Sequence, residues 1–204
     1  MSKRIVIIGA GGHGKVVADL AKLSGYEDII FLDDNLSQKR CGQYFVQGDS
    51  GDINKYSCDF IVAVGNSEVR KRKINELDKN NKNIVSLIHP RAVVAESVTI
   101  GRGSVVMAGA VINADASIGE GCIINTCASV DHDCKVGNYV HISVGAHVSG
   151  TVTINENTWI GAGATVINNL DITANCIVGA GALVVKDIVD SGVYVGVPVK
   201  KREK

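Results

Sequence analysis

The sequence lacks an excess of charge of either sign and lacks any long apolar run. Its 204 residues include 21 basic and 21 acidic side chains, so the formal net charge is zero. A neutral chain gives no electrostatic reason to bind nucleic acid or an anionic membrane surface. The apolar stretch at residues 5–10 is too short for a signal peptide or a membrane span, and no apolar run of 18 residues follows it. We therefore expect a cytoplasmic protein without a membrane span.

The sequence also lacks closely spaced cysteine pairs. None of its six cysteines forms a CxxC pair or shows the spacing of a zinc finger. Without a secretion signal, we expect reduced thiols that fill space as small apolar side chains. The six are Cys41, Cys58, Cys122, Cys127, Cys134 and Cys176.

The first part of the chain, residues 3–88, alternates short apolar runs with segments of helical periodicity. The apolar runs predict strands, and Asn66 can cap the second helical segment. Because strands and helices alternate, we expect a small parallel sheet. The predicted strands lie in residues 3–9, 28–34, 59–65 and 83–88, and the predicted helices in residues 12–25 and 67–80.

From residue 88 the periodicity changes to six. Every sixth residue from 88 to 184 is Val or Ile, at all 17 positions. Four residues later comes Ala, Ser, Cys, Thr or Val in 15 of the 17 cases, the exceptions being Leu170 and Ile188. A strict hexapeptide period predicts a parallel β-helix with the branched residue inside and three hexads per coil. We therefore divide the chain into domains at residues 1–87 and 88–204, the second including a C-terminal cap.

The stretch "VDHDC", residues 130–134, interrupts this repeat with a histidine between two aspartates. His132 and Asp133 are the third and fourth residues of their hexad, so both are expected to face outward near a bend. Asp133 can accept a hydrogen bond from the imidazole, which would fix the tautomer of His132 and raise its basicity. A solvated polar corner is the alternative interpretation.

A second histidine, His141, lies nine residues after His132, which is half of an 18-residue coil. Within one β-helix the two would lie on opposite sides, so they can share a site only if they come from different subunits. Trp159 is one coil beyond His141 and should stack on it. This geometry predicts a cleft between subunits.

The loop "GAGGHG" carries the GxGxxG pattern of dinucleotide-binding proteins through Gly9, Gly11 and Gly14. Asp33 follows 19 residues after Gly14, at the end of the second predicted strand. This matches the fingerprint in position and spacing. However, residues 1–87 amount to only about half of a full doubly wound domain. NAD is therefore one candidate ligand of this loop, and the backbone N–H groups at the helix N-terminus would suit its pyrophosphate.

Several segments together resemble the left-handed β-helix sugar acyltransferases of the PglD/NeuD type, in particular the PglD-like UDP-4-amino-sugar N-acetyltransferases. The resemblance implies a small Rossmann-like parallel α/β domain followed by a left-handed parallel β-helix of hexapeptide repeats. It also implies acetyl-CoA as co-substrate, no metal, a homotrimer with sites at subunit interfaces, and a role in bacterial glycan biosynthesis. The segments are "GAGGHGK", "GYEDIIFLDD", "IVAVGNSEVRKR", "MAGAVINADASIG", "NTCASVDHDCKVGNYVHISVGAHVSG" and "GVYVGVPVK".

The same resemblance implies three groups of site residues. The catalytic group is His132 as general base, Asp133 as the carboxylate that increases its basicity, and Asn125 in support. The group that binds the nucleotide sugar is Gly11, Gly12, His13, Asp33, Asp34, Gly65 and Glu68. The group that binds acetyl-CoA is His141, Ala162 and Ala180.

These expectations describe an N-acetyltransferase that acts on a nucleotide-linked amino sugar, with UDP as the expected nucleotide. The 4-amino group of the sugar attacks the thioester of acetyl-CoA, and His132 accepts the amine proton. One alternative is a sialic acid or other sugar O-acetyltransferase. Another is a zinc-dependent hydratase that uses His132, His141 and His147 across an interface. A third is a non-catalytic module that senses NAD.

Overall fold

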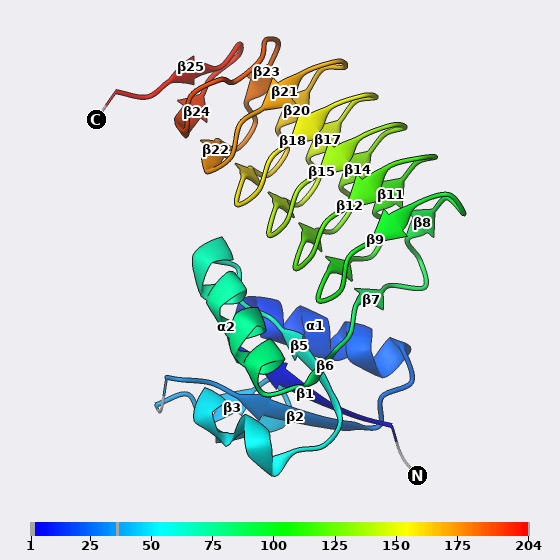
Figure 1. Ribbon diagram of the computed structural model, residues 1–204, viewed down its shortest axis with the longest axis vertical. Coiled ribbons are helices and arrows are strands. Elements are labelled where there is room, and N and C mark those ends of the chain that lie inside the picture. Colours follow the sequence, from blue (N-terminus) through cyan, green and yellow to red (C-terminus); the bar gives the residue numbers. More distant parts are fainter. Residues whose placement is uncertain (1–2, 36, 204) are drawn as a thin grey trace. The chain divides into compact units, whose positions relative to one another are not determined.

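The computed structural model of the protein describes residues 3–35 and 37–203. The chain forms two compact units, Met1–Pro90 and Arg91–Lys204. The sequence pattern alone placed the division three residues earlier, where the hexapeptide period begins. Each unit is described by itself below (Figure 1).

The first unit contains a six-stranded sheet in the order β3-β4-β2-β1-β5-β6. All neighbouring strands are parallel except β3 and β4, which form an antiparallel pair. The predicted parallel sheet is therefore confirmed, with the β3–β4 hairpin as an unpredicted edge. Of the predicted fourth strand, residues 83–88, only residues 83–84 join this sheet. The strands are β1 (Arg4–Ile8), β2 (Asp28–Leu32), β3 (Arg40–Cys41), β4 (Tyr44–Gly48), β5 (Asp59–Val62) and β6 (Asn83–Ile84), followed by β7 (Leu87–Ile88).

Two α-helices and one 3₁₀ helix complete this unit: α1 (Gly12–Leu23), η1 (Ser50–Lys55) and α2 (Ser67–Lys79). The side chain of Asn66 caps α2 as predicted, accepting a hydrogen bond from the Val69 N–H at 3.0 Å. Helical spacing groups Val16 with Val17, Leu20 and Ala21, but Val16 is 46% exposed while the other three are buried. Within the described residues, neither helix has the length and apolar character needed to cross a membrane.

The second unit is a parallel β-helix in which two-residue strands recur every six residues from β8 to β21. From β8 to β20 each strand pairs in parallel with the strand 18 residues further along, so three hexads form one coil, as predicted. At the C-terminal end β24 and β25 form an antiparallel pair. Its strands are β8 (Val93–Val94), β9 (Thr99–Ile100), β10 (Val105–Val106), β11 (Val111–Ile112), β12 (Ser117–Ile118), β13 (Ile123–Ile124), β14 (Ser129–Val130), β15 (Lys135–Val136), β16 (His141–Ile142), β17 (His147–Val148), β18 (Thr153–Ile154), β19 (Trp159–Ile160), β20 (Thr165–Val166), β21 (Asp171–Ile172), β22 (Cys176–Val178), β23 (Leu183–Val184), β24 (Gly192–Val195) and β25 (Lys200–Lys201).

These strands line up in three sheets along the β-helix (Figure 1). One sheet runs from β8 through β11, β14, β17 and β20 to β23, and a second runs from β9 through β12, β15 and β18 to β21. The third contains β10, β13, β16, β19 and β22, and ends in β24 and β25. Because consecutive strands belong to different sheets, side chains half a coil apart lie on different faces.

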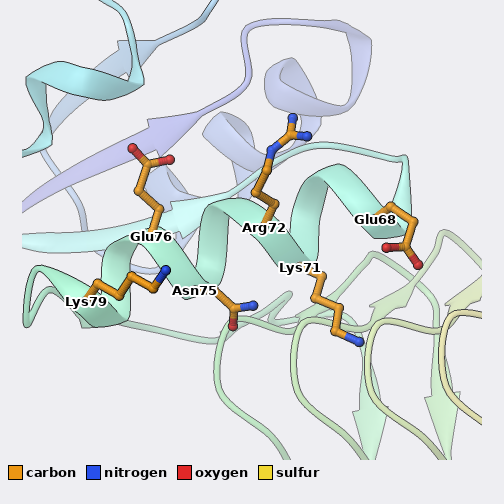
Figure 2. Close-up of a pocket in the computed structure, with 6 residues that line it drawn as sticks. All are labelled: Glu68, Lys71, Arg72, Asn75, Glu76 and Lys79. Atoms are coloured by element: carbon orange, nitrogen blue, oxygen red, sulfur yellow. The ribbon is translucent and has the colours of Figure 1, made fainter.

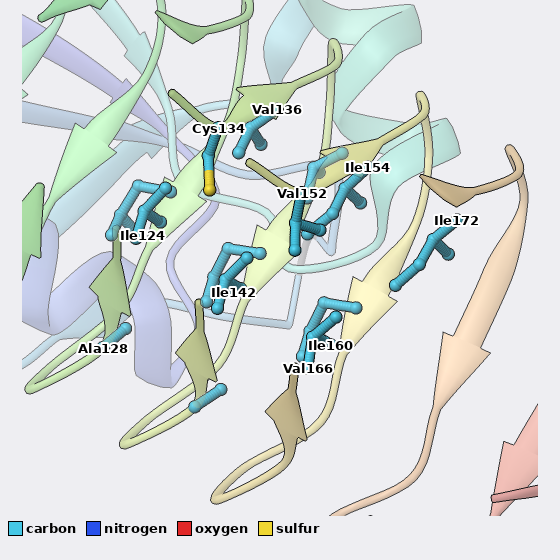
Figure 3. Packing of buried hydrophobic residues seen from close by; sticks show 14 of the residues in the cluster. Ile124, Ala128, Cys134, Val136, Ile142, Val152, Ile154, Ile160, Val166 and Ile172 are labelled. Atoms are coloured by element: carbon cyan, nitrogen blue, oxygen red, sulfur yellow. The ribbon is translucent and has the colours of Figure 1, made fainter. Parts of the chain in front are cut away.

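The interior of the β-helix is filled by the branched residues of the repeat (Figure 3). From Val106 to Val184 every Val or Ile of the period is buried. The first member of the series, Ile88, is 43% exposed, so the periodicity begins before the core does. The small position is buried from Ser104 to Ala164 and includes the buried Cys122, Cys134 and, further on, Cys176. Cys41 is also buried and Cys58 is half-buried.

Cys127 is exposed, so the expectation that the cysteines are buried is wrong for this residue. Cys127 is the fourth residue of its hexad and has a φ of 55°. The fourth residue of every hexad from Gly103 to Gly181 has a positive φ, as the turn at each corner requires. The third residue of a hexad therefore lies at the tip of a corner and points outward.

Candidate active site

His132 occupies such a corner, just after β14. Its backbone N–H donates to Asp131 Oδ1 at 2.8 Å, and the same oxygen accepts a hydrogen bond from Asn113 Nδ2 at 2.7 Å. The imidazole Nδ1 lies 2.8 Å from Asp133 Oδ2. The side chains of His132 and Asp133 are 57% and 58% exposed. The predicted hydrogen bond between them is therefore present, on a corner open to solvent.

The carboxylates around His132 favour its charged form. The hydrogen bond to Asp133, followed by the negative charge of Asp131, raises the pKa of the imidazole. With Nδ1–H donating to Asp133, the neutral ring carries its lone pair on Nε2. The corner therefore presents an oriented nitrogen base.

A second polar group lies on β16 and β19, in a different sheet from β14. The rings of His141 and Trp159 are stacked, with centroids 5.5 Å apart and planes 6° apart, as the one-coil separation predicted. Trp159 Nε1 donates to Ser143 Oγ at 2.5 Å. Trp159 is 48% exposed. The stack thus forms a flat aromatic surface that a ligand can reach.

Asn125 belongs to this second group. Its Nδ2 lies 3.1 Å from His141 Nε2, while its Oδ1 accepts a hydrogen bond from the Thr126 N–H at 2.8 Å. Sequence reasoning placed Asn125 with His132, but within one chain the structure places it against His141. The third histidine, His147, lies 2.8 Å from Ser129 Oγ through Nδ1.

Ala162 and Ala180 are the third residues of hexads that follow β19 and β22. Both are exposed at neighbouring corners. The Gly181 N–H donates to the Ala162 carbonyl at 2.8 Å, which joins the two corners directly. The predicted acetyl-CoA residues therefore lie along one edge of the sheet that carries Trp159.

The glycine loop forms a separate pocket in the first unit, with a volume of about 420 Å³. It lies where β1, β2 and β5 end, the usual place for a ligand in a parallel α/β sheet. Six of the seven residues predicted to bind the nucleotide sugar line it: Gly11, Gly12, His13, Asp33, Asp34 and Gly65.

The seventh residue, Glu68, does not line this pocket. It lies in the first turn of α2 and lines a shallow depression along the outer side of that helix (Figure 2). The other residues of the depression are Lys71, Arg72, Asn75, Glu76 and Lys79.

The two aspartates of the pocket have internal partners. Asp33 Oδ2 accepts a hydrogen bond from the Ala10 N–H at 2.6 Å, and Asp33 Oδ1 accepts one from the Asn35 N–H at 2.8 Å. Asp33 thus ties the glycine loop to the end of β2. Asp34 Oδ2 lies 2.6 Å from Lys73 Nζ. Burial opposes ionisation of Asp34, but hydrogen bonds from Lys73 and Ser50 outweigh it and lower the pKa to about 2.

Two buried cations of α2 were missed by sequence reasoning. Lys73 pairs with Asp34, and Arg70 Nη1 donates to the carbonyls of Val64 at 2.8 Å and Gly65 at 2.9 Å. Arg70 therefore holds the loop that follows β5. Helical spacing in the sequence could have identified them, because it places Arg70 and Lys73 on the same face as Ile74 and Leu77, the buried apolar residues of α2.

His13 is the one histidine of this pocket. Burial, followed by the positive charge of Arg70, lowers its pKa to about 4. His13 is therefore neutral near pH 7. Its Nε2 is buried and has no hydrogen-bond partner among residues 3–35 and 37–203.

Comparison with known proteins finds relatives of the first unit and of the chain as a whole. The sequence profile of the PglD N-terminal domain matches residues 4–77. The UDP-N-acetylbacillosamine N-acetyltransferase of Bacillus subtilis (strain 168) is 39% identical over 112 residues. That alignment spans 52% of this chain and 52% of the B. subtilis enzyme, about half the length of each.

Solved structures match over nearly the whole chain. The acetyltransferase domain of PglB from Neisseria gonorrhoeae FA1090 is 40% identical, with a TM-score of 0.94, and the match covers 98% of this chain and 100% of that one. A further structure of that domain is a complex with acetyl coenzyme A. PerB from Caulobacter crescentus, in complex with CoA and GDP-perosamine, is 38% identical with a TM-score of 0.91, and the match covers 98% and 97% of the two chains. With a Rossmann-like unit, a hexapeptide β-helix and full-length similarity at this level, the chain belongs to the left-handed β-helix sugar acyltransferases of the PglD type.

Proposed function

We propose that the protein transfers the acetyl group of acetyl-CoA to the amino group of a nucleotide-linked amino-deoxy sugar, with His132 as general base. The observation that carries this is the corner at His132. Its Nδ1 is bound to Asp133, and the lone pair of Nε2 is left for an incoming proton. Membership of the PglD-type family supplies the reaction class.

The reaction needs no enzyme nucleophile, because a thioester is already reactive toward an amine. The amine nitrogen attacks the thioester carbonyl, the C–N bond forms, and His132 Nε2 accepts the amine proton. The C–S bond then breaks and CoA leaves as the thiolate, which takes the proton from the imidazolium of His132 and so restores the neutral base. Proton transfer to a positioned base is typically worth about 10²–10⁴ in rate.

The acceptor's nucleotide is proposed to bind in the glycine pocket. The N-terminus of α1 has no side-chain cap and no acidic residue in its first turn, so its N–H groups are available to a pyrophosphate. We propose UDP as the nucleotide, as in the name of the B. subtilis enzyme, and bacterial glycan biosynthesis as the pathway class.

A single screen tests both substrates. UDP-, dTDP-, GDP- and CMP-linked amino sugars and their hydroxy counterparts would be assayed with acetyl-CoA for CoA release. We expect turnover of a UDP-linked 4-amino sugar. Preference for a hydroxy sugar would instead favour O-acetylation.

The complete site is proposed to lie between subunits of a homotrimer. His132 and the stacked pair of His141 and Trp159 belong to different sheets of one β-helix. They can meet only if one chain contributes the base and its neighbour contributes the acetyl-CoA surface, which also includes Asn125, Ala162 and Ala180. Light scattering should give the mass of a trimer, and an active monomer would exclude this arrangement.

Replacing Asp33 with alanine is expected to raise the KM for the nucleotide sugar about 10-fold or more, in line with the loss of one or two hydrogen bonds to a charged group. The substitution leaves the Ala10 and Asn35 N–H groups without their acceptor, so the glycine loop loses its position. The KM for acetyl-CoA should stay nearly unchanged, because that ligand is proposed to bind the β-helix. An effect confined to acetyl-CoA would contradict the assignment of the pocket.

Replacing Asp133 with asparagine is expected to move the pH profile of kcat/KM. The base acts when its imidazole is neutral, so activity rises with pH through the pKa of His132. Asp133 is the largest cause that raises this pKa, so its neutralisation lowers the pKa and shifts the rising limb to lower pH. The maximal kcat/KM at high pH should also fall, because the imidazole is a weaker base without Asp133. This loss should be smaller than the loss caused by removing the imidazole itself.

The substrate amine titrates in the same reaction, but its own pKa is the same for both enzymes. The difference between the two profiles therefore isolates His132. If the rising limb of the pH profile is unchanged in the Asp133→Asn variant, the His132 imidazole does not control the pH dependence of kcat/KM.

A further inference from the structure

Gly150 lies one coil beyond His132, directly against its imidazole. The Thr151 N–H donates to the His132 carbonyl at 2.9 Å, which fixes the two corners next to each other. A Cβ added to Gly150 would lie 2.6 Å from both Cε1 and Nε2 of His132. Real Cβ atoms essentially never approach so closely. The ring of His132 therefore occupies the space in which a side chain at position 150 would lie.

The β-helix itself does not need glycine at this position. Five glycines of the repeat are the second residue of a hexad, where an added Cβ would collide with the neighbouring coil: Gly101, Gly119, Gly137, Gly161 and Gly179. Six others are the fourth residue and have a positive φ: Gly103, Gly109, Gly121, Gly145, Gly163 and Gly181.

Gly150 belongs to neither set. It is the third residue of its hexad, and its φ is not positive. Among the 17 hexads that start at residues 88–184, it is the only glycine in third place; the others carry side chains as large as those of Arg102, Val144 and Lys186. The turn thus tolerates any ordinary residue there, and the contact that a Cβ would make is with His132.

We propose that Gly150 is a positioning residue that leaves room for the imidazole of His132 in the orientation that aims Nδ1 at Asp133 and Nε2 at the acceptor amine. This inference rests on the proposed role of His132. Because the backbone at both corners is fixed by the coil, a methyl group at position 150 would turn the ring away. That rotation would break the 2.8 Å contact with Asp133 or redirect Nε2.

The Gly150→Ala variant tests this directly. We expect kcat to fall about 10–100-fold, the usual cost of misplacing a reacting group by about an ångström. The KM values and the melting temperature should change little, since the backbone is unstrained and His132 is exposed. The pKa of His132, followed by NMR, should fall toward its ordinary value as the hydrogen bond to Asp133 is lost.

A double-mutant cycle separates positioning from other effects. In a His132→Ala background, Gly150→Ala should cause no further loss, because the side chain that it displaces is gone. Asn168→Ala is the matched control: Asn168 is the third residue of the hexad one coil beyond Gly150 and is exposed. That variant should keep the wild-type kcat.

The outcomes distinguish this inference from the function on which it rests. Wild-type kcat in Gly150→Ala, with an inactive His132→Ala variant, overturns the inference and leaves the function standing. An equal loss in both backgrounds also overturns it, because Gly150 would then act on something other than His132. An active His132→Ala variant overturns the proposed function itself.

Discussion

Replacing His132 with alanine is expected to lower kcat by about 10²–10⁴-fold, the range for loss of a general base. The fold should be unaffected, because the side chain is 57% exposed and its removal leaves no cavity in the β-helix. The KM values should move little, since the base acts only when the C–N bond begins to form. Steady-state kinetics with the best acceptor of the nucleotide-sugar screen, together with a thermal melt, measure these effects.

His147→Ala provides a control for the loss of an exposed histidine from the same β-helix. His147 contacts Ser129 and lies one coil from it on β17, without a carboxylate partner in that contact. We expect this variant to retain the wild-type kcat. If His132→Ala also retains it, the residues "VDHDC" are only a polar corner of the β-helix, and the proposed mechanism fails.

Much of the β-helix was predictable because its period fixes the direction of every side chain. Once the Val and Ile of the repeat point inward, the third residue of each hexad must lie at a corner, which placed His132 outside. The same reasoning placed Trp159 directly against His141, and the rings are stacked as expected. The period also placed Cys122, Cys134 and Cys176 in the core.

The period could not give contacts that depend on the particular side chains of adjacent coils. Asn125 and His141 are 16 residues apart, a diagonal contact whose direction depends on the amide rotamer. Likewise, the space beside Gly150 is visible only once the ring of His132 is placed. At the first hexad the period assigns Ile88 to the interior, but this residue is exposed because it lies before the buried core of the β-helix begins.

In the first unit, the two faces of α2 separate the residues near the glycine pocket from those away from it. Helical spacing places Arg70 and Lys73 with Ile74 and Leu77 on the buried side of α2. The carbonyls after β5 and the carboxylate of Asp34 hold these cations inside. Glu68 lies off this face, which explains why it does not line the glycine pocket.

Two inactive variants are expected to restore each other's activity when their subunits are mixed. One is His132→Ala, which lacks the base. The other is Ala162→Trp, which fills the exposed corner beside β19 that is proposed to hold the pantetheine chain of acetyl-CoA. Ala162 is exposed, so the fold should tolerate the larger side chain.

The expected recovery follows from the proposed symmetry. If each site takes His132 from one subunit and Ala162 from its neighbour in a closed ring of identical interfaces, about a third of the sites in a mixed trimer carry both native residues. Co-expression with two different affinity tags, followed by purification on both, gives mixed trimers for the assay of CoA release. Each variant expressed alone is the control and should remain inactive.

If His132 and Ala162 of the same chain formed the site, every subunit in the mixture would carry one defective residue, and no activity would return. Recovery to about a third of the wild-type rate therefore requires a site shared between subunits, since only closed association of chains can bring the two native residues together. No recovery in mixed trimers of confirmed composition would contradict the shared site even if the protein is trimeric. The two polar groups of one β-helix, His132 with Asp133 and His141 with Trp159, would then have separate roles.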